Sequence, residues 1–182
     1  MVVVVFGPVG CGKSTVAERL AERLGAVVIN SDVVRKGLFG VDPKRSMKAE
    51  YQKGIYSREV TDRVYRVMVE RALELAKRGN TVVLDATFSS SRYREMLRDE
   101  AGRFGVPVAF FYIDTPEDEI KRRLEKRARE GGVSDADWGV YLKMKDSFDP
   151  PEGAHRVRGD RAPDDVALDI LNILGKGGED GV

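Results

Sequence analysis

The chain begins with an apolar run at residues 2–6, which leads directly into the pattern Gly-x-x-x-x-Gly-Lys-Ser at residues 7–14. Four of the five residues in the run are valine, and a continuous β-branched run predicts a strand buried on both faces of a sheet. The residues after the pattern place apolar side chains every three or four positions, which predicts a helix. The chain therefore starts with a strand, a glycine-rich turn and a helix, the context in which this pattern binds phosphate.

The spacing within this pattern has a direct chemical meaning. Glycines allow backbone N–H groups to turn toward a phosphate, and the helix N-terminus adds a partial positive charge. Lys13 is placed to reach the β- and γ-phosphates of a nucleotide, and the Ser14 hydroxyl is placed to ligate Mg²⁺. Cys11, the only cysteine in the chain, is expected to contribute a backbone N–H. The expected nucleotide contacts are Gly7, Gly10, Cys11, Gly12, Lys13, Ser14 and Thr15.

The rest of the chain alternates short apolar segments with amphipathic ones, which predicts a parallel α/β sheet. We expect further strands at residues 27–30, 81–85, 106–113 and 155–158. Besides the helix after the loop, a short helix is expected to end at Leu38, with Ser31 or Asp32 as its N-cap. Longer helices are expected at about 57–78, 91–104, 116–130, 134–148 and 163–174. Residues 1–175 are interpreted as one domain and residues 176–182 as a flexible tail.

Composition excludes some classes of protein and favours others. The net charge is +1, so no global field points to nucleic acid or membrane. No apolar run approaches the roughly 20 residues needed to cross a bilayer, and we expect a cytoplasmic protein. Charged residues make up 34% of the chain, whereas it holds one glutamine and three asparagines. That balance favours a thermophilic source.

Two carboxylates follow predicted strands and are candidates for chemistry. Ligands of parallel sheets bind beyond the carboxyl ends of the strands. This rule places the glycine-rich loop, Asp32 with Arg35, and Asp85 with Thr87 at one edge. Asp32 is a candidate proton acceptor, and its alternative role is a helix cap. Asp85 is a candidate Mg²⁺ ligand beside Ser14, and its alternative role is a cap for the following turn.

Basic residues gather in two stretches. Residues 35–71 contain ten basic and five acidic residues, which suits either a solvated helix face or a wall that attracts an anionic acceptor. Residues 121–129 form a second basic run before Gly131 and Gly132. Arg123 and Arg127 lie one helical turn apart there. They are interpreted as arginines of a helical lid at about 123–137, with a solvated helix surface as the alternative.

These residues together resemble the P-loop kinases, and in particular the 5′-hydroxyl polynucleotide kinases and the zeta-toxin-like and small P-loop kinases. The resemblance covers roughly residues 2–150 and rests on the loop, on Asp32 and Arg35, on the segment 83–88 and on the paired lid arginines. It implies a P-loop NTPase sheet of five parallel strands in the order 2-3-1-4-5, flanked by helices, with ATP and Mg²⁺ as cofactors. It also implies that Asp32 is the general base and that Arg35 contacts a phosphate of the acceptor.

We therefore expect a kinase that transfers the γ-phosphate to a hydroxyl, with the 5′-OH end of DNA or RNA as the favoured acceptor. Lys13, Asp32, Arg123 and Arg127 are its expected catalytic residues. Asp32, Arg35, Asp85 and Thr87 are its expected acceptor-side residues. The first alternative is a kinase for a small hydroxyl compound such as a sugar, a nucleotide sugar or an antibiotic. The second is a nucleotide-binding switch without catalysis, which the position of Asp32 disfavours. His155 is interpreted as structural.

Overall fold

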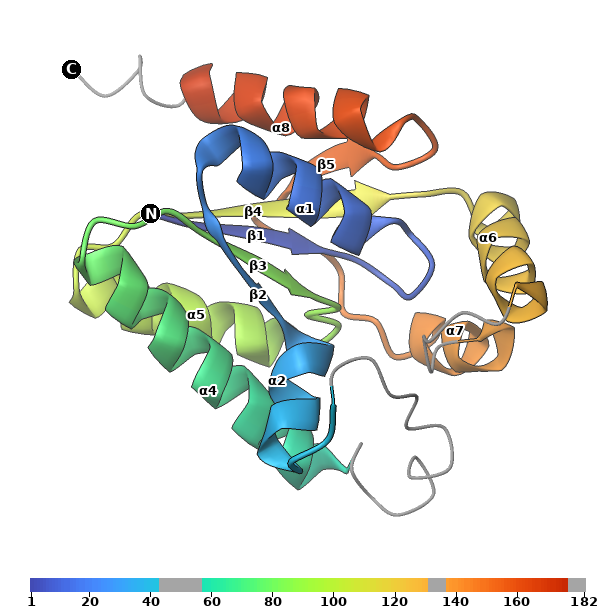
Figure 1. Ribbon diagram of the computed structural model, residues 1–182, viewed down its shortest axis with the longest axis horizontal. Coiled ribbons are helices and arrows are strands. Elements are labelled where there is room, and N and C mark those ends of the chain that lie inside the picture. Colours follow the sequence, from blue (N-terminus) through green and yellow to red (C-terminus); the bar gives the residue numbers. More distant parts are fainter. Residues whose placement is uncertain (43–56, 131–136, 177–182) are drawn as a thin grey trace.

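The computed structural model of the chain describes residues 1–42, 57–130 and 137–176. Within these ranges the strands form one five-stranded parallel sheet in the order β2-β3-β1-β4-β5 (Figure 1). The strands are β1 (Val2–Phe6), β2 (Val27–Asn30), β3 (Val82–Ala86), β4 (Val108–Asp114) and β5 (His155–Arg158). The strand order that the resemblance implied is confirmed.

Helices cover both faces of this sheet. Figure 1 shows α1 and α8 on one face, α4 and α5 on the other, and α6 and α7 beyond the carboxyl ends of the strands. Their bounds are α1 (Lys13–Leu24), α2 (Ser31–Leu38), α4 (Arg58–Lys77), α5 (Ser91–Arg103), α6 (Glu117–Arg129), α7 (Trp138–Lys145) and α8 (Pro163–Lys176). Among the described residues, no helix is both long and apolar enough to cross a membrane.

The first strand forms the centre of both halves of the core, and all five of its residues are fully buried. Successive side chains of a strand point to opposite faces. Val2, Val4 and Phe6 accordingly pack into the cluster that contains α4 and α5 residues, whereas Val3 and Val5 pack into the cluster of α1 and α8. Burial on both faces explains why this segment is apolar at every position rather than at alternate ones.

Strand register brings the segments that carry polar residues to one edge of the sheet. The last residue of β1, Phe6, is level with Ala86 on β3 and with Tyr112 on β4. Asn30, at the end of β2, is level with Asp85. The glycine-rich loop, the start of α2 and the segment after β3 therefore leave the sheet side by side, as the sequence predicted.

Several element bounds differ from the predicted ones. The helix expected at 134–148 is α7 and begins at Trp138, and the strand expected from residue 106 begins at Val108. Helix α8 continues to Lys176, so the predicted tail begins at least one residue too early. Other predictions concern residues 43–56, the part of the predicted lid at 131–136, and the tail at 177–182. These lie outside the described residues.

The predicted cap of α2 is wrong. Its N-cap is Asn30, whose Oδ1 accepts hydrogen bonds from the backbone N–H groups of Asp32 and Val33 at 2.9 and 3.1 Å. Asparagine is as good an N-cap as serine or aspartate, but its place as the last residue of a strand hid this role. The Asp32 carboxylate is consequently not needed to start the helix.

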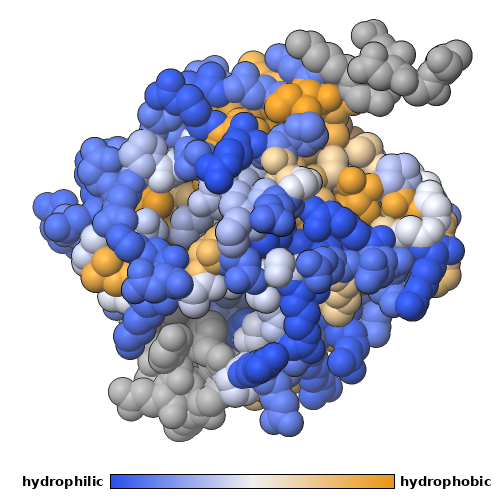
Figure 2. Space-filling model, turned by 180° about the vertical axis from the view of Figure 1, so that it is seen from behind, coloured by the Kyte–Doolittle hydropathy of each residue, from blue (hydrophilic) through white to orange (hydrophobic). Residues whose placement is uncertain are grey.

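The face opposite to that in Figure 1 is largely hydrophilic. Figure 2 shows hydrophobic atoms there in separate patches, with the larger ones in the upper part of the view. Single exposed apolar side chains are normal on a protein surface.

Candidate active site

The glycine-rich loop between β1 and α1 has a backbone that other residues rarely adopt. Gly10 and Gly12 have φ angles of +81° and +97°. A Cβ atom on Gly10 would lie 2.8 Å from Cγ of Leu124, so the loop also packs too closely against α6 for any side chain there. Gly12 is the N-cap of α1 and supplies no side chain to the first N–H groups of that helix. Those donors and the helix dipole are oriented to bind an anion.

The polar residues of this loop lie at the start of α1. Lys13 is half-buried, while Ser14 and Thr15 are exposed. Cys11 is fully buried, and burial raises the pKa of its thiol despite the opposing charges of Lys13 and Arg123. Cys11 therefore remains a neutral thiol, and the nucleotide contact of its backbone N–H stays a prediction.

Asp85, on β3, is 2% exposed. Asn30 Nδ2 donates a hydrogen bond to its Oδ2 at 2.6 Å. Its Oδ1 is buried and has no hydrogen-bond partner among the described residues. A buried carboxylate oxygen without a partner is costly, which points to a further partner such as a cation or water. Asn30 thus connects the start of α2 to Asp85, a role that the sequence analysis did not assign to it.

Asp32 and Arg35 share the first turns of α2 but differ in environment. The Asp32 side chain is exposed, whereas Arg35 is 7% exposed and its Nη1 lies 3.4 Å from Thr61 Oγ1 on α4. Burial raises the pKa of the Tyr65 hydroxyl; the Arg35 charge opposes this rise and the Asp32 charge adds to it. The charges of Asp32 and Arg35 therefore both act on the Tyr65 hydroxyl. This agrees with the expectation that residues one helical turn apart face the same region.

Thr87 follows β3 and is held by a residue that the sequence analysis missed. The Tyr65 hydroxyl lies 3.3 Å from Thr87 Oγ1 and accepts a hydrogen bond from the Phe88 N–H at 2.9 Å. Arg94 Nη1 donates to the Phe88 carbonyl at 2.6 Å. These contacts hold Phe88 at a φ of +42°, which is rare for any residue other than glycine. Tyr65 lies on the apolar face of α4 and could only be predicted as a core residue.

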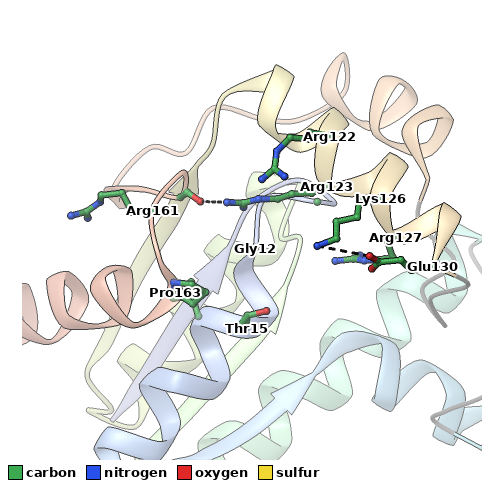
Figure 3. A pocket seen from close by; sticks show the side chains of 12 residues that line it. Gly12, Thr15, Arg122, Arg123, Lys126, Arg127, Glu130, Arg161 and Pro163 are labelled. Carbon is green, nitrogen blue, oxygen red and sulfur yellow. Dashed lines mark hydrogen bonds and ion pairs between the residues drawn. The ribbon is translucent and has the colours of Figure 1, made fainter.

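A cavity of about 360 Å³ lies between the glycine-rich loop and α6 (Figure 3). Gly12 and Thr15 line one side, and cationic side chains from α6 line the other. From α6 it is lined by Arg122, Arg123, Lys126 and Arg127, and Glu130 follows as the C-cap of that helix. Lys126 and Glu130 form an ion pair at 3.8 Å, so part of this positive charge is balanced. The cavity suits a polyanion that also contacts the loop.

The structure separates the two lid arginines. Arg127 is exposed and lines the cavity. Arg123 also lines the cavity, but all three of its nitrogens donate to protein oxygens, namely Glu119 Oε1, the Cys11 carbonyl and the Gly159 carbonyl, at 2.7 to 2.9 Å. The two arginines, one helical turn apart, therefore differ in environment, because Arg123 contacts the loop and Arg127 is exposed.

The loop, the parallel sheet in the order 2-3-1-4-5 and the carboxylate at the end of β3 define the fold of a P-loop kinase. Comparison with known families agrees with this class. Residues 2–151 match the family described as AAA domain, and the chain belongs to that family.

Individual relatives show how far the likeness extends. A protein of Mycobacterium tuberculosis described as uncharacterized is 33% identical over 72% of this chain, but the match spans only 26% of that protein's length. The adenylate kinase of Mycolicibacterium smegmatis is 31% identical over 80% of this chain and 78% of its own length. Among solved structures, the APS kinase of Mycobacterium tuberculosis, in complex with AMPPNP and APS, has a TM-score of 0.72. It is 23% identical and covers 96% of both chains.

Proposed function

We propose that this chain is an ATP-dependent phosphotransferase that acts on a small anionic acceptor. The observation that carries the proposal is the joint placement of the glycine-rich loop, the partnerless Asp85 Oδ1 and the cationic cavity under α6 at one edge of the sheet. Phosphoryl transfer depends on positioning and charge stabilisation more than on covalent chemistry, and this edge offers both.

The cytoplasmic location expected from the sequence remains a prediction.

The residues of this edge fit a bound Mg²⁺. A hydroxyl at Ser14 and a carboxylate at Asp85 are oxygen ligands of the kind that Mg²⁺ prefers, and Mg²⁺ keeps most of its other positions for water and phosphate. Such an ion or its water shell would supply the partner that Asp85 Oδ1 lacks within residues 1–42, 57–130 and 137–176. When bound, Mg²⁺ would neutralise charge on the β- and γ-phosphates. Lys13 and the loop amides would hold the same phosphates.

On the acceptor side, Asp32 would take the proton of the attacking hydroxyl, and Arg35 would bind an anionic group of the acceptor. An exposed carboxylate next to a buried guanidinium allows both roles in one site. Thr87 adds a hydroxyl that Tyr65 holds in place. The transferred group would face Arg127 across the cavity.

The likeness to an adenylate kinase and to an APS kinase supports a small-molecule acceptor more than the 5′-OH nucleic acid end favoured from the sequence. To test this, the protein is incubated with γ-labelled ATP and Mg²⁺ and a panel of acceptors. The panel contains nucleoside monophosphates, APS, sugars, sugar phosphates and 5′-OH oligonucleotides. Label transfer to a small anionic compound supports the proposal. Label transfer to oligonucleotides alone would restore the assignment of a 5′-OH nucleic acid acceptor. Transfer to none of these compounds would favour a nucleotide-binding switch without catalysis.

Arg127→Ala should lower kcat by about 10²-fold and change nucleotide affinity little, because a lid arginine stabilises charge that develops in the transition state. The measurement is steady-state kinetics with the acceptor found above, beside titration with MgADP. Arg129→Ala is the matched control, since Arg129 is exposed on the same helix and its Nε bonds the backbone of that helix. If the Arg127 variant kept the full kcat of the wild type, Arg127 would have no catalytic role and would belong only to a solvated helix surface.

Arg35→Lys should raise KM for an acceptor that carries a phosphate or sulfate and leave KM for ATP unchanged. A lysine keeps the charge but cannot form two parallel hydrogen bonds to one anionic group. A matched acceptor without the anionic group should be poor with the wild type and respond little to the substitution. Arg63→Lys, at an exposed position of α4, serves as the control. Equal wild-type rates on the two acceptors would contradict the assignment of Arg35.

A further inference from the structure

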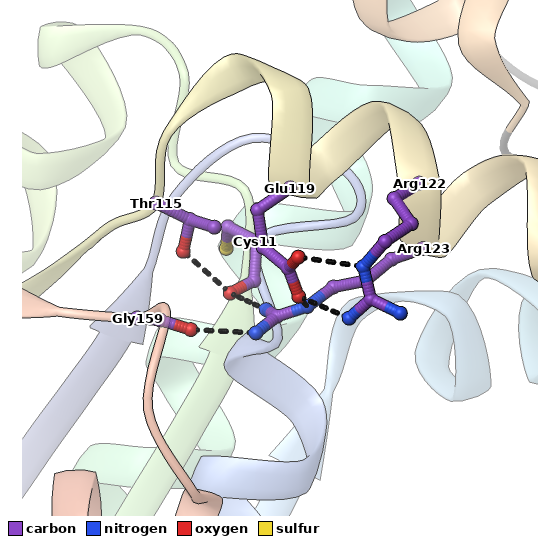
Figure 4. Close-up of polar contacts among 6 residues, drawn as sticks. All are labelled: Cys11, Thr115, Glu119, Arg122, Arg123 and Gly159. Carbon is purple, nitrogen blue, oxygen red and sulfur yellow. Dashed lines mark hydrogen bonds and ion pairs between the residues drawn. The ribbon is translucent and has the colours of Figure 1, made fainter.

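The carbonyl oxygen of Cys11, inside the phosphate loop, accepts two hydrogen bonds from outside the loop. Thr115 Oγ1 and Arg123 Nη1 both donate to it at 2.9 Å (Figure 4). Thr115 follows β4 and Arg123 lies on α6, so two separate segments reach the same atom. The Thr115 side chain is buried and the Arg123 side chain is 25% exposed. This carbonyl is therefore held by a clamp, defined here as Thr115 and Arg123.

The clamp is itself anchored on two sides. Glu119 accepts from Arg123 Nε at 2.7 Å. Hydrogen bonds from Arg122, and then from Arg123, lower the pKa of Glu119 to about 2, so this anchor remains charged. Arg123 Nη2 donates to the Gly159 carbonyl at 2.8 Å. A Cβ atom on Gly159 would collide with Thr115 Oγ1 and lie 2.5 Å from Ile113 Cγ2, so only glycine allows this close approach.

Holding this carbonyl has a consequence for the next residue. The peptide group is planar and trans, so the C=O of Cys11 and the N–H of Gly12 point in opposite directions. Gly12 has a φ of +97° and a ψ of 6°, and glycine by itself permits several orientations of this peptide group. Two donors on the carbonyl select one of them and leave the Gly12 N–H directed away from the clamp.

We propose that Thr115 and Arg123 are positioning residues that fix the Cys11–Gly12 peptide group and thereby direct the Gly12 N–H at the bound phosphate. This inference rests on the proposed function, because it concerns the same nucleotide site. It gives Arg123 a role that differs from that of the catalytic lid arginine expected from the sequence. It also gives Thr115 a role that its position before the helix-starting Pro116 did not suggest.

The first test uses inorganic tripolyphosphate with Mg²⁺, a probe that has phosphates but no base. Thr115→Val and Arg123→Lys should each weaken its binding about tenfold, measured by titration calorimetry, a size expected for one misaligned hydrogen bond to a charged group. MgADP should lose affinity to the same extent. Thr115→Ser keeps the hydroxyl and should bind like the wild type. Thr81→Val, just before β3, and Arg103→Lys, on α5, make the same chemical changes at positions outside the site and serve as controls.

The losses of binding free energy in Thr115→Val and Arg123→Lys should be less than additive in the double variant, because both substitutions act on the Cys11 carbonyl. Melting temperatures are recorded for every variant, so that a loss of affinity is compared only among folded proteins. A loss for MgADP but not for tripolyphosphate in Arg123→Lys would mean direct contact with the nucleoside, and would overturn the positioning role of Arg123. Unchanged affinity in Thr115→Val would overturn the role of Thr115.

A second test needs no ligand. In free protein labelled with ¹⁵N-glycine, the Gly12 amide resonance should shift or broaden in Thr115→Val and Arg123→Lys, and stay in place in Thr115→Ser and in the controls. An unchanged Gly12 resonance in both clamp variants would overturn the proposal. If the wild type bound neither tripolyphosphate nor nucleotide, the proposed function would fail, and this amide measurement would still decide whether the clamp orients the loop.

Discussion

Replacing Lys13 with alanine should reduce phosphoryl transfer to background while the protein keeps its fold. Lys13 begins α1 and is half-buried at the edge of the sheet, outside the apolar clusters that form the core. Its contribution is a positive charge beside the β- and γ-phosphates, which a methyl group cannot replace. Alanine is also the best helix former, so the start of α1 should tolerate it.

The measurement is label transfer from γ-labelled ATP, together with the melting temperature of the variant. Arg19→Ala provides the control, because Arg19 is an exposed cation on the same helix, away from the loop. Its ion pairs with Glu22 and Asp164 are exposed and contribute little to stability. Turnover near that of the wild type in a folded Lys13→Ala protein would contradict the kinase assignment altogether.

Asp32→Asn should lower kcat by about 10²–10⁴-fold, the range usual for the loss of a general base. The substitution keeps the shape of the side chain and removes its ability to accept a proton. Thermal stability should not change, because the cap of α2 is the Asn30 side chain and the Asp32 backbone N–H that it binds is retained. Steady-state kinetics, MgATP titration and thermal unfolding together separate these effects.

Asp85→Asn is the matched comparison, since both residues are aspartates at the same edge of the sheet. Its activity should fall at low Mg²⁺ and recover in part at high Mg²⁺, because the substitution weakens a metal ligand rather than a base. Asp32→Asn should show no such recovery. If Asp32→Asn were nearly as active as the wild type, the base would have to be sought at Asp85 or in a metal-bound water.

The pattern of apolar residues and glycines predicted those helices, strands and turns whose structure is determined by their own residues. The run at residues 2–6 and the glycine-rich loop require no distant residue to be recognised, and both were confirmed as β1 and the turn before α1. Strand order was different, since it came from the resemblance and not from periodicity. The observed order of the sheet, β2-β3-β1-β4-β5, confirmed it.

Contacts across long stretches of sequence could not be predicted. The cap at Asn30 was missed because its side chain serves two segments at once, with Oδ1 on α2 and Nδ2 on Asp85. The direction of Arg123 was missed because its partners, Cys11 and Gly159, lie 112 and 36 residues away. Helical periodicity places Arg123 near Arg127, but it does not tell which of them the tertiary packing leaves exposed.

The close packing of Gly10 on α6 divides that helix into two mechanical parts. Ile120 and Leu124 are 1% exposed and press on the loop, whereas the side chains at residues 125–130 are exposed. The first part of α6 is thus held by packing against the loop, whereas the second part is exposed and carries Arg127. Bending of the helix beyond Leu124 would displace the guanidinium of Arg127 relative to the cavity without disturbing the loop. A displacement of Arg127 would therefore leave the packing of Ile120 and Leu124 on Gly10 in place, although both belong to a single helix.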